Sequence, residues 1–182
     1  MTTHEIETIE SRTAYRNRWM HVREDQVRRA DGSTGIYGVV EKPDFAVIVP
    51  VDADGSLHLV EQYRYPVKGR YWEFPQGAWE HAPDADPVEL ACGELREETG
   101  LVAGRMTRIG HLFTAVGYST QGCHVFLAEE LTRTETALEV EEQGLVSGTF
   151  AREAVIAMIR DGTIKDATTV AALGLIDLMR GG

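Results

Sequence analysis

Three glutamates lie close together in the segment LACGELREETGL, residues 90–101. Glu94, Glu97 and Glu98 are spaced i, i+3 and i+4, so a helix would place their carboxylates within an arc of roughly 100°. Like charges at this spacing cost an isolated helix about 0.2–0.5 kcal/mol per pair. A divalent cation that prefers oxygen ligands, Mg²⁺ or Mn²⁺, would offset the repulsion. The alternative is an acidic helix face that is exposed to solvent.

Capping signals define the helix that carries these glutamates. Asp86 suits the N-cap, Pro87 suits the first helical position, and Gly100 suits the residue after the last turn. The pattern predicts a helix over residues 87–99. On a helical wheel, Arg96 points roughly 100° or more away from all three glutamates. The predicted core-facing stripe consists of Val88, Ala91, Cys92, Leu95 and Thr99.

Composition disfavours several classes of partner. The chain has 182 residues, which suits one domain with a small extra element. Its 29 acidic and 18 basic residues give a net charge of −11, which argues against nucleic acid and anionic membrane as partners. The longest apolar run, residues 45–51, is far too short to span a bilayer. Cys92 and Cys123 form no disulfide framework, and the N-terminus does not resemble a signal peptide, so a cytoplasmic location is expected.

The remainder of the chain alternates strand and helix signals. The first 18 residues are polar and are expected to be partly disordered. The order of strands, helix, strands and helices predicts an α+β fold or a mixed α/β/α layer arrangement. The predicted elements are a hairpin over 19–40 that turns at Asp31-Gly32, strands at 46–51, 57–65, 101–114 and 122–128, and helices at 87–99, 151–160 and 166–179.

The segment ELREETGL, residues 94–101, resembles the second half of the Nudix box. In that signature a glycine, five residues, a glutamate and seven residues precede Arg-Glu-aliphatic-x-Glu-Glu-x-Gly-aliphatic. Gly77 in WEFPQG matches the opening glycine, but the loop after it is about two residues longer. Ala85 stands where the first glutamate should lie, and Gly93 where the arginine should lie. An arginine at 93 would tie the helix to the preceding loop, whereas a short residue would allow close backbone packing.

The resemblance extends to the ADP-ribose pyrophosphatase branch of the Nudix hydrolases through VEQYRYP (60–66) and IRDGTIKDATTVAAL (159–173). It implies an α+β fold, a Nudix α/β/α sandwich with a mixed sheet and an N-terminal antiparallel hairpin or sheet. Residues 1–44 would form a tail and β-hairpin for dimerisation, and residues 45–182 the Nudix hydrolase domain. A homodimer is thereby implied, with the hairpin around Trp19 facing the partner subunit.

The same resemblance implies roles for individual acidic residues. Glu94 and Glu98 would be the main metal ligands, Glu97 would share or bridge, and the backbone carbonyl of Gln76 would complete the shell. Glu141 and Glu142, in the stretch LEVEEQG, are catalytic candidates for the general base beside Glu98, with Glu139 as a spare. The alternative for this stretch is a charged loop with no part in catalysis.

Four further residues match substrate-contacting positions of the family: Arg64, Glu73, Gly117 and Tyr118. A guanidinium fork suits a diphosphate, and an aromatic ring could stack on a base. The alternatives are a surface salt bridge for Arg64, a structural role for Glu73 and simple packing for Tyr118. The six histidines, His111 among them, have no metal-ligand spacing and are interpreted as structural or surface residues.

These implied roles combine into one expected reaction. It is the metal-dependent hydrolysis of the diphosphate bond of ADP-ribose or a related nucleoside diphosphate sugar, with Mg²⁺ or Mn²⁺ as cofactor. The products would be a nucleoside monophosphate and a sugar phosphate. The alternative is a Nudix-fold protein that binds a nucleotide in a regulatory role without efficient turnover.

Overall fold

The computed structural model describes residues 5–79, 82, 85–134 and 144–181. The chain divides into two compact units, and each is described by itself. Unit 1 consists of Met1–Asp44 and Phe113–Gly122, and unit 2 of Phe45–Leu112 and Cys123–Gly182. Among the helices in these described ranges, none combines the length and apolar character needed to cross a bilayer.

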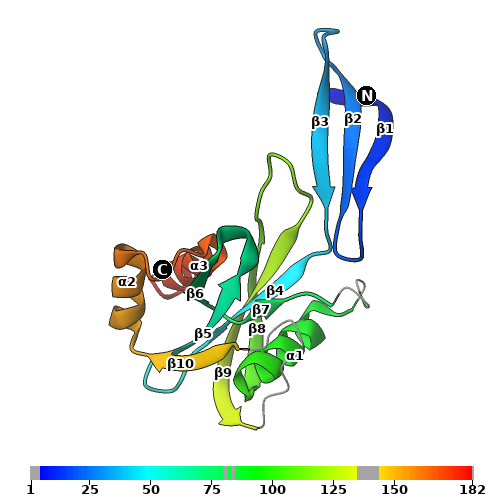
Figure 1. The fold of residues 1–182 in the computed structure, drawn as a ribbon. Helices are drawn as coiled ribbons and strands as arrows, with labels where there is room; N and C mark the ends of the chain where they lie inside the picture. Colours follow the sequence, from blue (N-terminus) through cyan, green and yellow to red (C-terminus); the bar gives the residue numbers. More distant parts are fainter. Residues whose placement is uncertain (1–4, 80–81, 83–84, 135–143, 182) are drawn as a thin grey trace. The chain divides into compact units, whose positions relative to one another are not determined.

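Unit 1 contains an antiparallel sheet of three strands, β1 (Ile6–Arg16), β2 (His21–Arg29) and β3 (Thr34–Glu41), with β2 in the centre (Figure 1). The predicted hairpin is confirmed, and Gly32 adopts φ +83° at its turn. The partial disorder expected for the first 18 residues is wrong for residues 6–16, which form β1. Every residue of β1 is exposed. Its polar side chains bond across the sheet, as Arg12 does to Glu24 at 2.9 Å, so polarity here indicates a solvated strand.

Unit 2 contains two sheets. The first is mixed, in the order β7-β4-β9-β8, with β4 parallel to β9 and antiparallel to β7. The second is antiparallel, in the order β10-β5-β6. The strands are β4 (Phe45–Pro50), β5 (Leu57–Arg64), β6 (Gly69–Glu73), β7 (Gln76–Gly77), β8 (Leu101–Phe113), β9 (Gly122–Arg133) and β10 (Val146–Phe150), and the short 3₁₀ helix η1 (Tyr65–Val67) joins β5 to β6.

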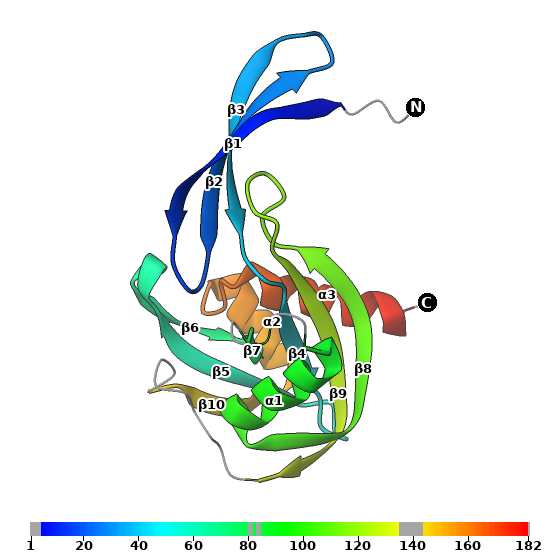
Figure 2. The ribbon, with the colours of Figure 1, turned by 90° about the vertical axis from the view of Figure 1, so that its right-hand side faces the viewer.

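Three helices cover the two faces of the mixed sheet (Figures 1 and 2). Helix α1 (Pro87–Thr99) lies on one face, and α2 (Arg152–Asp161) and α3 (Ala167–Arg180) lie on the other. Successive residues of β4 point to opposite faces of the mixed sheet. Ala46 and Ile48 pack into the apolar cluster of α1, whereas Val47 and Val49 pack into the cluster of α2 and α3. The strand is therefore apolar throughout, and the predicted α/β/α sandwich is confirmed.

Helix α1 has the predicted ends. Asp86 Oδ1 accepts a hydrogen bond from the backbone N–H of Val88 at 2.8 Å, and Gly100 adopts φ +66° at the C-terminus. The predicted core-facing stripe is partly wrong, because Val88 and Cys92 are exposed. The helix is rotated so that its buried face also includes acidic residues. That face consists of Leu90, Ala91, Gly93, Glu94, Leu95, Glu98 and Thr99.

Candidate metal-binding site

The carboxylates of helix α1 divide into two that are buried and one that is not. Glu94 is 4% exposed and Glu98 is 1% exposed, whereas the Glu97 side chain keeps 20% of its surface accessible. Burying a carboxylate is costly unless hydrogen bonds or a cation compensate for the lost hydration. The alternative of a solvent-exposed acidic face therefore does not describe Glu94 and Glu98.

Glu98 is held by the backbone of the segment that the resemblance singles out. The N–H of Gln76 donates to Glu98 Oε2 at 3.0 Å. Gln76 belongs to β7 and is in register with Val47 of β4, so the mixed sheet fixes its position. Gln76, whose backbone carbonyl is the implied fourth ligand of the metal ion, thus lies directly beside Glu98.

Gly77 leaves room for the carboxylate of Glu94. A Cβ atom on Gly77 would lie 2.5 Å from Glu94 Cδ and Oε1 and still closer to Oε2, which real Cβ atoms do not approach. A glycine at residue 77 therefore allows the Glu94 carboxylate to approach the backbone closely. Glu94 and Glu98, one turn apart on α1, face the two consecutive residues of β7.

The donor set fits a hard cation. Glu94, Glu97 and Glu98 offer only carboxylate oxygens, the ligand chemistry that suits Mg²⁺ or Mn²⁺. Arg96 Nη2 lies 3.9 Å from Glu97 Oε1, so a basic side chain does approach the acidic face.

Arg64 and Glu73, two of the predicted substrate contacts, bond to each other. Arg64 Nη2 and Nε donate to the two carboxylate oxygens of Glu73 at 2.5 and 3.2 Å. Glu73 is buried, whereas the Arg64 side chain is 39% exposed. Burial raises the pKa of the Glu73 carboxyl, Arg64 acts against that rise, and Asp166 adds to it. The bidentate contact with Glu73 therefore fixes the orientation of the half-exposed Arg64 guanidinium.

Two residues that the sequence analysis did not assign hold the same segment from helix α3. Asp166 is the N-cap of α3, and its Oδ2 accepts hydrogen bonds from Thr169 N at 2.7 Å and Oγ1 at 2.8 Å. Thr169 Oγ1 in turn accepts from the N–H of Phe74 at 2.9 Å, and Gln76 Nε2 donates to Asp166 at 3.4 Å. Asp166 could have been recognised in the sequence as a capping residue, because it stands at the start of a predicted helix in the stretch IRDGTIKDATTVAAL.

The other predicted site residues belong to unit 1 or lie outside the described residues. Gly117 and Tyr118 belong to unit 1, where Tyr118 is 60% exposed and its carbonyl accepts from Val40 N at 2.7 Å. The catalytic candidates Glu141 and Glu142, with the spare Glu139, lie outside the described residues. The chain is described again from Gly144, whose carbonyl accepts from Arg70 Nη2 at 2.7 Å.

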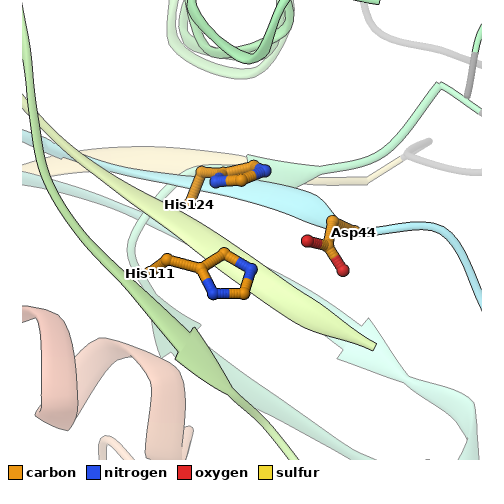
Figure 3. A group of neighbouring side chains, drawn as sticks. All are labelled: Asp44, His111 and His124. Carbon is orange, nitrogen blue, oxygen red and sulfur yellow. The ribbon is translucent and has the colours of Figure 1, made fainter. Parts of the chain in front are cut away.

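A pair of histidines was not anticipated from the sequence. His111 of β8 and His124 of β9 have ring centroids 4.8 Å apart at an interplanar angle of 47° (Figure 3). Their strands are neighbours in the mixed sheet, a proximity that spacing along the chain does not reveal. Asp44, which Figure 3 also labels, is the last residue of unit 1 and accepts from Gly122 N at 2.7 Å.

Comparisons with known proteins cover nearly the whole chain. The NUDIX domain matches residues 41–169, and the nucleoside diphosphate sugar hydrolase N-terminal domain matches residues 6–40. An ADP-ribose pyrophosphatase of Mycobacterium tuberculosis is 32% identical over 176 residues, 95% of this chain and 84% of the relative. An ADP-ribose pyrophosphatase of Bacillus subtilis is 27% identical, over 98% and 96% of the two chains. A solved ADP compounds hydrolase shares the fold with a TM-score of 0.86, 22% identity, and coverage of 100% of this chain and 97% of that one.

Replacing Gly77 with alanine tests the contact with Glu94. The added Cβ must displace the carboxylate, so we expect Gly77→Ala to weaken Mn²⁺ binding by about tenfold, measured by isothermal titration calorimetry. The control is Gly174→Ala, because a Cβ there meets nothing within 4 Å. Equal Mn²⁺ affinities in the two variants would contradict the importance of this contact.

The raised pKa of Glu73 predicts a pH dependence of stability. Between its ordinary value of 4.5 and the raised native value, the native state binds more protons than the unfolded chain. The contribution of Glu73 to the free energy of unfolding therefore falls as pH rises through this window. Urea denaturation from pH 4.5 to neutrality should show that fall in the wild type and a flatter profile in Glu73→Gln. The matched control, Glu153→Gln, removes an exposed carboxylate of α2, and equal slopes in both variants would contradict the prediction.

Proposed function

The chain belongs to the NUDIX family and is a pyrophosphatase of the Nudix type, and from this premise we propose that it hydrolyses ADP-ribose or a related nucleoside diphosphate sugar. Cleavage of the diphosphate bond would give a nucleoside monophosphate and a sugar phosphate. One observation carries the proposal: α1 buries Glu94 and Glu98 against the backbone of Gln76 and Gly77.

A divalent cation, Mg²⁺ with Mn²⁺ as a substitute, is part of the proposal. When bound, it would neutralise the diphosphate and lower the pKa of the attacking water. Glu94 and Glu98 are the main ligands that we propose, and Glu97 is the more exposed third. With a net charge of −11, the protein needs such a cation to attract an anionic substrate.

The protein's own groups would orient the substrate and the attacking water. Glu73 fixes the Arg64 fork, whose half-exposed guanidinium suits a phosphate oxygen pair. Gly117 and Tyr118 remain proposed contacts for the nucleoside. Glu141 and Glu142 remain the proposed general bases, beside Glu98.

The proposed partner is thus a small molecule, and we place the reaction in the cytoplasm. Cys92 is exposed and Cys123 is buried, and the two do not form a disulfide with each other, as a reducing compartment favours. The acidic surface argues against nucleic acid as a further partner, because phosphate backbones are bound mainly by lysine and arginine.

Turnover of ADP-ribose with Mg²⁺ tests the enzyme directly. We expect the wild type to release AMP and ribose phosphate, measured by coupling to a phosphatase. Glu98→Gln should lower kcat by at least about a hundredfold, because the amide keeps the shape but loses the charge of a metal ligand. Glu89→Gln is the matched control, because Glu89 is an exposed residue of the same helix. Equal kcat values in the two variants would contradict the role of Glu98 as a metal ligand.

The departures from the Nudix signature favour one second candidate, a nucleotide-binding regulatory protein without efficient turnover. Ala85 and Gly93 replace a glutamate and an arginine of that signature. Calorimetric binding of ADP-ribose without hydrolysis of any nucleotide sugar in a panel with Mg²⁺ or Mn²⁺ would select this candidate. Release of a monophosphate from any member of the panel would select the hydrolase.

A homodimer through the unit 1 sheet is the final part of the proposal. This sheet and the turn between β1 and β2 expose apolar side chains that a second copy could cover, namely Ile6, Ile9, Tyr15, Trp19, Ile36 and Tyr37. We expect light scattering after size exclusion to give twice the monomer mass of 20.2 kDa. Ile36→Glu should shift the protein towards monomer, whereas Leu178→Glu, at an apolar residue of α3 that is even more exposed, should not. A monomeric wild type would contradict the dimer.

A further inference from the structure

Two glycines make room for side chains where helix α1 meets residues 76–79, the segment that begins with β7. Gly77 of β7 leaves room for the carboxylate of Glu94. Gly93 of the helix leaves room for the indole of Trp79, since a Cβ on Gly93 would lie 3.1 Å from Cη2, 3.3 Å from Cε2 and closer still to Cζ2. The helix thus places the Glu94 side chain against Gly77, and the segment places the Trp79 side chain against Gly93.

Together with the hydrogen bond from Gln76, these contacts form an ordered series. Gln76 meets Glu98, Gly77 meets Glu94, and Trp79 meets Gly93. The segment therefore runs from 76 to 79 while the helix runs from 98 back to 93, which is an antiparallel register. A slide or rotation of the helix against the segment would disturb all three contacts at once.

Trp79 is also anchored on the apolar side of the helix. It is partly buried against the cluster that includes Leu90, Ala91 and Leu95 of α1 and Ile48 of β4. With the indole in this place, no side chain larger than hydrogen fits at residue 93. Gly93 is a poor helix former, so its presence inside α1 requires a packing reason, and Trp79 supplies one.

We propose that Trp79 is a positioning residue for the carboxylate site and takes the place of the arginine that the Nudix signature has at residue 93. By packing on Gly93, the indole keeps Gln76 N on Glu98 and Gly77 against Glu94. The proposal rests on the metal-dependent function proposed above. It differs from a purely structural role, in which loss of the indole would lower stability and leave the metal affinity of the folded protein unchanged.

Metal binding by folded variants separates these two roles. Mn²⁺ affinity is measured by calorimetry at a temperature at which circular dichroism shows each variant to be folded. We expect Trp79→Ala and Gly93→Ala each to weaken Mn²⁺ binding by about tenfold. The matched controls are Gly174→Ala, which adds a Cβ to a helix in open space, and Leu101→Ala, which removes a buried side chain from the cluster that Trp79 contacts.

The double variant Trp79→Ala/Gly93→Arg provides a rescue. An arginine at 93 can pair with Glu97 four residues later and refill the space of the indole. We expect it to bind Mn²⁺ several-fold more tightly than Trp79→Ala alone. At saturating Mg²⁺, Trp79→Ala should regain most of its kcat for ADP-ribose, because the defect lies in holding the cation.

Several outcomes would overturn the proposal. If Trp79→Ala melts as early as Leu101→Ala but binds Mn²⁺ like the wild type, Trp79 only fills the core. If the wild type binds no Mn²⁺, there is no site for Trp79 to position. If the wild type binds Mn²⁺ and the variants weaken it, but no nucleotide sugar is hydrolysed, the proposed function fails while the positioning role stands.

Discussion

The burial of two carboxylates on the inner side of helix α1 is the constraint on which the rest of the site depends. Carboxylates at 4% and 1% exposure need polar partners, and Gln76 provides one from the backbone of β7. The helix can approach β7 this closely only because Gly77 has no side chain. The buried face of α1 is therefore shared between apolar residues that hold the helix on the sheet and acidic residues that could hold a cation.

The segment from Glu73 to Gly77 is fixed from several directions. Glu73 bonds to Arg64 of β5, Phe74 to Thr169 of α3, and Gln76 to Glu98 of α1. Because α1 and α3 lie on opposite faces of the mixed sheet, this segment links the two helical layers. Rigid placement of this kind suits a site in which a displacement of about 1 Å is costly for catalysis.

Local signals predicted the three helices and strands β2, β3, β4, β5, β8 and β9, whereas β1, β6, β7, β10 and the contacts distant in sequence were not predicted. The ends of α1 followed from Asp86 and Gly100, whose roles depend only on neighbouring backbone. The rotation of α1 that buries Glu94 and Glu98 was not predicted, because a hydrophobic pattern treats every glutamate as facing solvent. Strand β1 was missed since its polar residues gain order from pairing with β2. The adjacency of His111 and His124 depends on which strands are neighbours, information that a single sequence does not contain.

Gly93 shows how a departure from a family signature acquires a physical reason. Taken alone, it removes a basic partner of Glu97 and weakens the helix. In the structure, the space above it contains Trp79, from the loop that the missing arginine would have held. An apolar contact does not fall off with ionic strength as an exposed ion pair does, and it leaves Glu97 without a neighbouring cation from that position. The indole still ties the helix to that loop, so the exchange of arginine for a glycine and tryptophan pair is compatible with a working metal site.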